Sequence, residues 1–282
     1  MNYTTLISPA LLAEKLENPD CLVVDCRFTL TDPERGQRDY LKGHIPGAVY
    51  AHLDRDLSAP VVKGKTGRHP LPVPETAARL FSTWGVSPQT QVVVYDDAGG
   101  ALAAVRAWWM LRWLGHLHVA VLDGGWQHWT AGEFPQTARE ESRKPHTFIP
   151  MPRPEVVLST EQVDAIRLDS AYRLLDARAS ERYHGRNETI DPVAGHIPGA
   201  FSAPYLENLD QRGCFKTPEA LHQHYQALLG DIPADHAVFY CGSGVTSIHN
   251  ILAMLHAGMG EARLYAGSWS EWIADPARPV AV

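Results

Sequence analysis

The chain has few cysteines and lacks the usual patterns of a metal site. Its 282 residues include four cysteines at irregular spacing, and neither a CxxC pair nor an HExxH sequence occurs. So few scattered cysteines suit a reducing compartment better than a disulfide framework. Without the metal-binding patterns a zinc site is not expected. We therefore predict a cytoplasmic protein that needs no metal or other cofactor.

Long apolar runs and an excess of basic residues are also missing. No run of about 18 apolar residues is present, so no membrane span and no membrane partner are expected. The first residues have neither the basic region nor the apolar core of a signal peptide. The net charge of -7 argues against nucleic acid as a partner. A hydrophobic content of 45% with 20% charged residues is ordinary for a soluble globular protein.

Several sequence landmarks occur twice, in the same order. The segment Gly-His-Ile-Pro-Gly-Ala occupies 43–48 and returns at 195–200, and an Asp-x-Arg tripeptide precedes each copy. Late in each half a glycine is followed by two tryptophans. This repetition predicts two homologous domains, at 1–135 and 155–282. Residues 136–154 are rich in proline and charge, which is typical of an extended linker.

Within each half, short apolar runs alternate with helical patterns. The predicted strands are Cys21–Cys26, Gln91–Tyr95, Val119–Leu122, Arg173–Asp176, Ala237–Tyr240 and Ala262–Tyr265. Continuous apolar strands separated by helices indicate an α/β fold with a mainly parallel sheet flanked by helices in each domain. Ser8 and Ser159 precede helical patterns and are predicted N-caps. In such sheets, functional sites lie at the carboxyl ends of the strands.

One such strand end carries a cysteine. Cys241 follows the apolar run 237–240 and precedes a predicted amphipathic helix. Two glycines let the intervening loop curl tightly, and its N–H groups together with the helix dipole favour an anion on sulfur. The predicted cradle consists of Cys241, Gly242, Ser243, Gly244, Val245 and Thr246. The alternative is a buried apolar cysteine, which is also the expectation for Cys21, Cys26 and Cys214.

The first half offers a comparison for this loop. Aligning the strands that end at Tyr95 and Tyr240 places Asp96 where the second half has Cys241. A carboxylate there would repel an anion and cannot carry sulfur. We therefore predict that the N-terminal domain is inactive and the C-terminal domain catalytic.

Taken together, these motifs resemble those of tandem-domain rhodanese-type sulfurtransferases. The resemblance covers nearly the whole chain, through both His-Ile-Pro-Gly-Ala segments, the Cys-Gly-Ser-Gly-Val-Thr loop and the closing Gly-Ser-Trp-Ser-Glu-Trp. The loop is similar to that of the 3-mercaptopyruvate branch. The thiosulfate branch typically has basic residues after the cysteine, where this chain has Gly242 and Ser243.

The resemblance implies a persulfide on Cys241. The thiolate attacks the sulfur of a small donor, 3-mercaptopyruvate or thiosulfate, and an acceptor then removes the sulfur in a second step. The acceptor is a thiol or cyanide, with thioredoxin-like proteins among the candidates. Ser243 either assists proton transfer and donor binding or bonds only to loop backbone.

Three arginines and one histidine complete the predicted site. By resemblance, Arg182 matches a donor-binding position, whereas Arg178 either binds donor or pairs with a neighbouring acid, as its counterpart Arg27 could. The mercaptopyruvate enzymes place a second arginine near the position of Asp191, and the local arginine available here is Arg186. The resemblance also suggests a first-domain histidine near the serine. His44 is the candidate, with a turn histidine bonded to backbone as the alternative.

Two other functions fit parts of the pattern. A cysteine phosphatase needs an arginine six residues after the cysteine, and that position is Ser247. The phosphatase hypothesis therefore fails on spacing. A non-catalytic sulfur carrier stays open, because a fold alone does not establish activity.

Overall fold

The computed structural model describes residues 3–282, which form two compact units. Unit 1 comprises Met1–Ala59, Leu71–Arg153 and Arg212–Cys214, of which the first two residues are not described. Unit 2 comprises Pro60–Pro70, Pro154–Gln211 and Phe215–Val282. A segment of the first half of the sequence therefore belongs to unit 2. No helix among residues 3–282 is long and apolar enough to cross a membrane.

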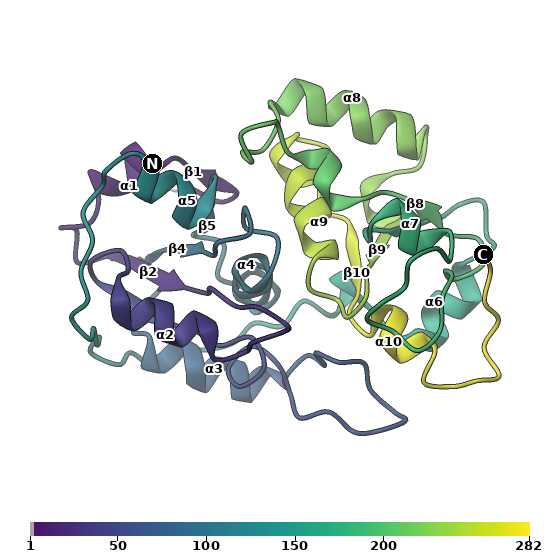
Figure 1. Ribbon diagram of the computed structural model, residues 1–282, viewed down its shortest axis with the longest axis horizontal. Helices are drawn as coiled ribbons and strands as arrows, with labels where there is room; N and C mark the ends of the chain where they lie inside the picture. The colour runs from purple at the N-terminus through teal and green to yellow at the C-terminus, as the bar shows by residue number, and fades with distance from the viewer. Residues whose placement is uncertain (1–2) are drawn as a thin grey trace. The chain divides into compact units, whose positions relative to one another are not determined.

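Unit 1 is an α/β sandwich around a five-stranded parallel sheet in the order β1-β5-β4-β2-β3. Its strands are β1 (Leu6–Ile7), β2 (Cys21–Asp25), β3 (Ala48–Tyr50), β4 (Gln91–Tyr95) and β5 (Val119–Leu122). Its helices are α1 (Pro9–Ala13), α2 (Arg35–Lys42), α3 (Pro74–Thr83), α4 (Ala103–Trp113) and α5 (Gly125–Ala131). Helices α1 and α5 lie on one side of this sheet and α3 and α4 on the other (Figure 1).

Unit 2 repeats this architecture, with the strand order β6-β10-β9-β7-β8, again parallel. Its strands are β6 (Val157–Leu158), β7 (Arg173–Asp176), β8 (Phe201–Ser202), β9 (Ala237–Tyr240) and β10 (Arg263–Tyr265). Its helices are α6 (Thr160–Ile166), α7 (Ser180–Tyr183), α8 (Pro218–Leu229), α9 (Ser247–His256) and α10 (Ser268–Trp272), with short 3-10 turns η1 (Pro154–Val156), η2 (Tyr205–Asn208) and η3 (Ala234–His236). Helices α6 and α10 lie on one side of this sheet and α8 and α9 on the other (Figure 1). The predicted fold class is confirmed.

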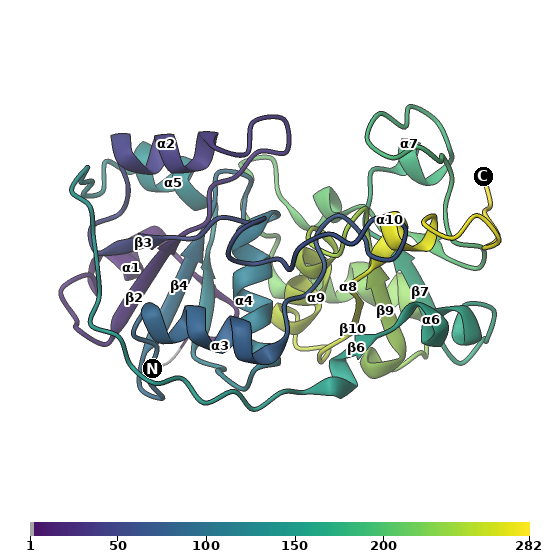
Figure 2. The ribbon, with the colours of Figure 1, turned by 90° about the horizontal axis from the view of Figure 1, so that it is seen from below.

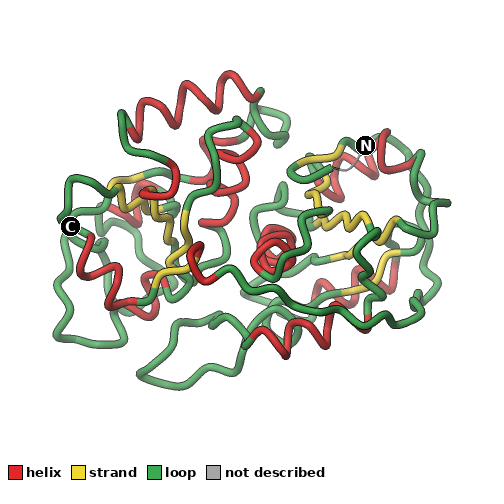
Figure 3. Tube along the Cα trace, turned by 180° about the vertical axis from the view of Figure 1, so that it is seen from behind, coloured by secondary structure: helices red, strands yellow, loops and turns green. Residues whose placement is uncertain are grey.

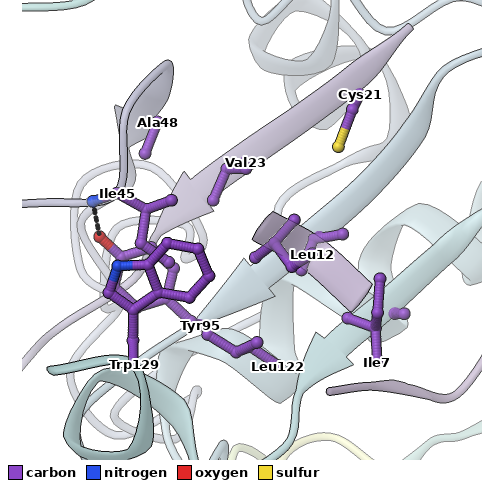
Figure 4. Close-up of a cluster of buried hydrophobic side chains, with 11 residues drawn as sticks. Ile7, Leu12, Cys21, Val23, Ile45, Ala48, Tyr95, Leu122 and Trp129 are labelled. Carbon is purple, nitrogen blue, oxygen red and sulfur yellow. Dashed lines mark hydrogen bonds between the residues drawn. The ribbon is translucent and has the colours of Figure 1, made fainter. Parts of the chain in front are cut away.

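The central strands are buried along their whole length, which explains their continuous apolar sequence. In unit 1, Val93 and Tyr95 of β4 pack with Leu12 of α1 and Trp129 of α5, and the Tyr95 hydroxyl accepts a hydrogen bond from the Ile45 N–H (Figure 4). In unit 2, Tyr240 likewise accepts from the Ile197 N–H. The His-Ile-Pro-Gly-Ala repeat is thus part of the core of each unit.

The two predicted N-caps are confirmed. Ser8 Oγ accepts from the Leu11 N–H, and Ser159 forms a capping box with Gln162. Each cap binds N–H groups that a helix cannot satisfy internally. The four strands Gln91–Tyr95, Val119–Leu122, Arg173–Asp176 and Ala237–Tyr240 have the predicted bounds.

The proline-rich segment 136–153 has no regular helix and runs along unit 1 (Figure 2). Its backbone is fixed there, because Thr137 pairs with His44 and the N–H of Met151 donates to the Leu114 carbonyl. Arg143 adds hydrogen bonds to the carbonyls of Pro19 and Cys21. The predicted linker is therefore an ordered segment that packs on unit 1.

The segment Pro60–Pro70 is also irregular (Figure 3), and it lies beside α10 (Figure 2). The N–H of Arg68 donates to Ser270 Oγ at 3.1 Å, and the N–H of Gly67 donates to the Glu271 carboxylate at 3.4 Å. A side chain at Gly67 would begin 2.6 Å from the Gly267 carbonyl oxygen. Glycine at 67 therefore permits the close approach of this segment to unit 2.

Candidate active site

Cys241 lies directly after β9, at the carboxyl end of the central strand of unit 2. The residue is 3% exposed. Its N–H donates to Ser268 Oγ at 3.1 Å, and its carbonyl accepts from the Trp269 N–H at 3.0 Å. The start of α10 therefore fixes the backbone of the cysteine, and Ser268 adopts a left-handed φ of 56° to do so. This contribution of the Gly-Ser-Trp-Ser-Glu-Trp motif was not predicted.

The two loop glycines have distinct structural reasons. Gly244 has φ of 72°, and a Cβ there would lie 2.1 Å from the Ala266 carbonyl oxygen, so the tight turn excludes any other residue. A Cβ on Gly242 would lie 2.7 Å from Arg68 Nη2 and 3.8 Å from both terminal nitrogens of Arg182. Gly242 thus leaves room for two guanidinium groups beside the cysteine.

The same loop in unit 1 binds an anion of its own. The buried carboxylate of Asp96 accepts from the N–H groups of Ala98 at 2.9 Å, Gly100 at 2.8 Å and Leu102 at 3.0 Å. Burial raises the pKa of Asp96 to about 6, and these N–H groups oppose that rise. The loop conformation therefore directs several backbone donors at the first residue after the strand.

In unit 2 the corresponding donors have no protein acceptor. Ser243 and Val245 follow Cys241 by two and four residues, as Ala98 and Gly100 follow Asp96. Within residues 3–282, no hydrogen bond to another protein atom is made by the N–H groups of Ser243, Val245 and Thr246. The donors that bind a carboxylate in unit 1 are thus available to an anion in unit 2.

Ser243 pairs with a histidine that sequence reasoning missed. Its Oγ lies 2.7 Å from Nδ1 of His69, and both side chains are buried. His69 belongs to the segment Pro60–Pro70, which packs within unit 2. The hydroxyl of Ser243 therefore contacts a side chain, and its part in proton transfer or donor binding stays a prediction. A hydroxyl and an imidazole at this distance can pass a proton between them.

His44, the predicted first-domain contribution, is fully buried within unit 1. Its Nδ1 lies 2.7 Å from the Tyr40 carbonyl oxygen, and its ring stacks on that of Tyr40. His196 makes the same contacts with Tyr183. Because both units use the histidine in this way, its contacts belong to the repeated fold. The alternative of a turn histidine bonded to backbone agrees with the structure, and the proposed role passes to His69.

Arg182 stands beside the cysteine loop, as the resemblance implied, and a second arginine joins it. The Asp191 carboxylate binds Arg182 at 2.8 Å and also forms an ion pair with Arg68. Arg182 further pairs with Glu188 at 2.9 Å. Although burial raises the pKa of Glu188, its hydrogen bond with Arg182 brings that pKa below its usual value. The acid at the position expected for an arginine therefore holds two arginines in place.

Arg178 forms a buried structural ion pair instead. It lies 2.6 Å from Asp176, donates to the Gly195 carbonyl and stacks over Trp269. Burial lowers its pKa, but the neighbouring Asp176 carboxylate outweighs this and raises it above the usual value. Arg27 of unit 1 repeats this arrangement with its own acid, carbonyl and tryptophan. The ion pair given as one alternative for Arg178 is therefore observed, and donor binding by this arginine stays a prediction.

Donor binding by Arg186 stays a prediction. Its side chain is exposed and makes no ion pair with any residue of the described range 3–282. A different arginine, Arg68, lies beside the loop, although it is far away in sequence. A signal was available, because Pro60–Pro70 concentrates lysine, arginine, histidine and glycine without any apolar periodicity. No repeat or spacing rule, however, links that segment to Cys241.

The remaining cysteines are all free thiols. Cys21 and Cys26 are buried, as expected. Cys214 is half-buried, and its Sγ lies 3.6 Å from Nδ1 of His128. The prediction of a buried structural thiol is therefore wrong for Cys214.

Comparison with known proteins agrees with this geometry. The family description "rhodanese-like domain" matches residues 8–132 and 159–275. A protein of Pseudomonas aeruginosa named as a probable 3-mercaptopyruvate sulfurtransferase is 51% identical over all of this chain and 99% of its own length. The bovine thiosulfate sulfurtransferase is 31% identical over 96% of this chain and 92% of its own.

A solved structure leads to the same family. The 3-mercaptopyruvate sulfurtransferase from Leishmania major superimposes with a TM-score of 0.82 at 29% identity. The match covers 95% of this chain and 74% of that one. The duplicated sheet, the cysteine loop and these similarities together show that this chain belongs to the rhodanese-like family, of which it carries two domains.

Proposed function

We propose that the protein is a sulfurtransferase that carries sulfur as a persulfide on Cys241. One observation carries the proposal: the backbone donors that bind the Asp96 carboxylate in unit 1 have counterparts at Ser243 and Val245 without a protein acceptor. A persulfide anion on Cys241 is the group that these donors would stabilise. Unit 1, with Asp96 in that position, is proposed to be inactive.

The preferred donor in this proposal is 3-mercaptopyruvate. Arg68 and Arg182 beside Gly242 supply guanidinium groups for its carboxylate. The Ser243–His69 pair suits its keto oxygen, on which charge develops during transfer. The Pseudomonas aeruginosa relative, named for this donor, supports the choice. Thiosulfate is the second candidate, favoured by the same two arginines and by the bovine relative.

The first step moves sulfur from carbon to Cys241. The thiol gives its proton to the Ser243–His69 pair, and the thiolate attacks the donor sulfur. The carbon–sulfur bond breaks, and its electron pair forms the enolate of pyruvate. The pair returns the proton to the enolate carbon, which yields pyruvate and a Cys241 persulfide.

The second step releases the sulfur. An acceptor thiolate or cyanide attacks the outer sulfur, the sulfur–sulfur bond breaks, and its electron pair returns to Cys241. The acceptor leaves as a persulfide or as thiocyanate. Thioredoxin-like proteins are the proposed macromolecular acceptors. A reducing cytoplasm is the proposed location, because the thiol must be regenerated and all four cysteines are free.

Mass spectrometry and steady-state kinetics test the proposal together. Brief exposure to 3-mercaptopyruvate without acceptor should add one sulfur atom to Cys241, and this atom should disappear when cyanide is added. With a common acceptor, kcat/KM should be higher for 3-mercaptopyruvate than for thiosulfate. A higher value for thiosulfate would assign the second donor. The absence of added sulfur with either donor would indicate a non-catalytic module.

A further inference from the structure

The charged groups beside Cys241 form a closed, balanced cluster. Asp191 pairs with Arg68 and Arg182, Glu188 pairs with Arg182 and lies 3.6 Å from Arg178, and Arg178 pairs with Asp176. We name these six residues the arginine–carboxylate cluster. Three guanidinium groups thus face three carboxylates, so the cluster carries no net charge.

Asp191 occupies a special place within this cluster. Its side chain is 1% exposed, and its two oxygens bind two different arginines, Oδ1 facing Arg68 and Oδ2 facing Arg182. These are the two arginines that a side chain on Gly242 would meet. One buried carboxylate therefore orients both guanidinium groups at the cysteine loop and offsets part of their charge.

We propose that Asp191 makes the site selective for a donor with a single negative charge. This inference rests on the proposed function and extends it to the physical basis of donor choice. A monoanionic carboxylate gains the oriented N–H donors of Arg68 and Arg182 without needing a large excess of positive charge. A dianion such as thiosulfate loses more hydration on entry, and Asp191 repels its second charge.

Two neighbours of the cluster, Glu271 and the cysteine loop, bring no positive charge. Glu271 lies behind the segment Pro60–Pro70, where its carboxylate accepts from the Gly67 N–H and the Thr160 hydroxyl. Residues Gly242 to Thr246 of the loop are uncharged. The balance around the donor is therefore set by the arginine–carboxylate cluster, and in it Asp191 is the acid shared by the two loop-facing arginines.

Substitution of Asp191 tests the inference through the ratio of the kcat/KM values for the two donors. Asp191→Asn keeps the shape and removes one negative charge, so the ratio of kcat/KM for thiosulfate to that for 3-mercaptopyruvate should rise about tenfold. Asp191→Glu should keep the ratio near that of the unmodified protein. Arg68→Gln should move the ratio the opposite way, because a dianion loses more from the missing cation. Arg139→Gln changes an exposed arginine of unit 1 and is the control, which should leave both values unchanged.

A binding measurement separates this inference from the proposed function. In a Cys241→Ser background, calorimetry should show that Asp191→Asn strengthens thiosulfate binding about tenfold relative to pyruvate binding. An equal loss for both ligands, or an unchanged ratio, would overturn the inference and leave Asp191 as a positioning residue. If the unmodified protein transfers no sulfur from either donor, the proposed function fails, and the binding ratio still decides the role of Asp191.

Discussion

The loops 96–102 and 241–247 occupy the same place in their units and begin with different side chains, Asp96 and Cys241. Each follows the central strand of its sheet, and each has its first carbonyl bound by a tryptophan N–H, at 2.9 Å in unit 1 and 3.0 Å in unit 2. In unit 1 the loop donors bind the carboxylate of Asp96. In unit 2 the loop begins with Cys241, and the N–H groups of Ser243 and Val245 bind no protein atom of residues 3–282. The comparison indicates that the fold supplies a loop whose N–H groups can bind an anion. The side chain of the first loop residue decides whether these groups bind a carboxylate of the protein itself.

The charged side chains beside the two loops also differ. In unit 1 the residue next to Asp96 is another acid, Asp97. Arg35 forms ion pairs with Asp97 and with Asp39. In unit 2 that place belongs to Gly242, which leaves space for Arg68 and Arg182. The acid next to Asp96 is therefore already bound by an arginine of its own unit.

A third difference lies where the following helix begins. Gly125 has φ of 58°, and Ser268 adopts φ of 56° at the corresponding place. A left-handed conformation costs a non-glycine residue about 1 kcal/mol. The hydrogen bond from the Cys241 N–H to Ser268 Oγ offsets this cost and fixes the backbone of the cysteine. Unit 2 thus accepts local strain at its reactive residue, where unit 1 uses glycine.

The largest effect should come from making the second loop a copy of the first. Cys241→Asp places a carboxylate among the same donors, so the protein should stay folded and lose all sulfur transfer. Activity with 3-mercaptopyruvate and a thermal unfolding curve measure the two outcomes. Cys214→Ser, which changes a thiol outside the loop, is the control and should stay active. Sulfur transfer by the Cys241→Asp variant would contradict the persulfide mechanism.

The next largest effect should come from His69, and it distinguishes this histidine from His196, which belongs to the repeated fold. His69→Asn removes the partner of Ser243 and should lower kcat for 3-mercaptopyruvate about 100-fold, because proton transfer to the enolate loses its relay. KM should change little, since the arginines stay. His196→Asn alters a histidine that stacks on tyrosine in the repeated fold, and it should affect stability rather than kcat. Equal kcat values for the His69 variant and the unmodified protein would remove the relay from the mechanism.

The smallest effect concerns the pH dependence of stability in unit 1. The folded pKa of Asp96 is raised to about 6, mainly by burial, so its protonated form is favoured by folding. The associated stability is present below the ordinary pKa of about 4 and lost as pH rises through about 6. The free energy of unfolding of the unmodified protein, minus that of Asp96→Asn, should therefore fall by about 1–3 kcal/mol between pH 4 and pH 7.

Denaturant titrations across that range measure this difference. A rise with pH would mean that the N–H groups of Ala98, Gly100 and Leu102 outweigh burial and hold the carboxylate charged. That outcome would mean that the N–H groups of the unit 1 loop stabilise a charged carboxylate by more than burial destabilises it. It would also strengthen the case for the same donors around Cys241.

The sequence by itself determined the parts of this protein that depend on neighbouring residues. Continuous apolar runs defined the central strands, because a parallel sheet buries both faces. Ser8 and Ser159 marked helix starts, since a cap acts within one turn. The internal repeat aligned Asp96 with Cys241 and so predicts which half of the chain is catalytic.

Only the tertiary structure decided which distant groups meet at the cysteine. Arg68 and His69 reach unit 2 through a segment without periodicity, held by contacts with Ser270 and Glu271. The resemblance suggested Arg186 and His44, but the fold leaves one exposed and uses the other for a tyrosine stack. Long-range contacts of this kind depend on how complete elements pack, and no local pattern records them. The proposed reactive residue, Cys241, is therefore predicted by the sequence, and the groups beside its loop are brought there by the fold.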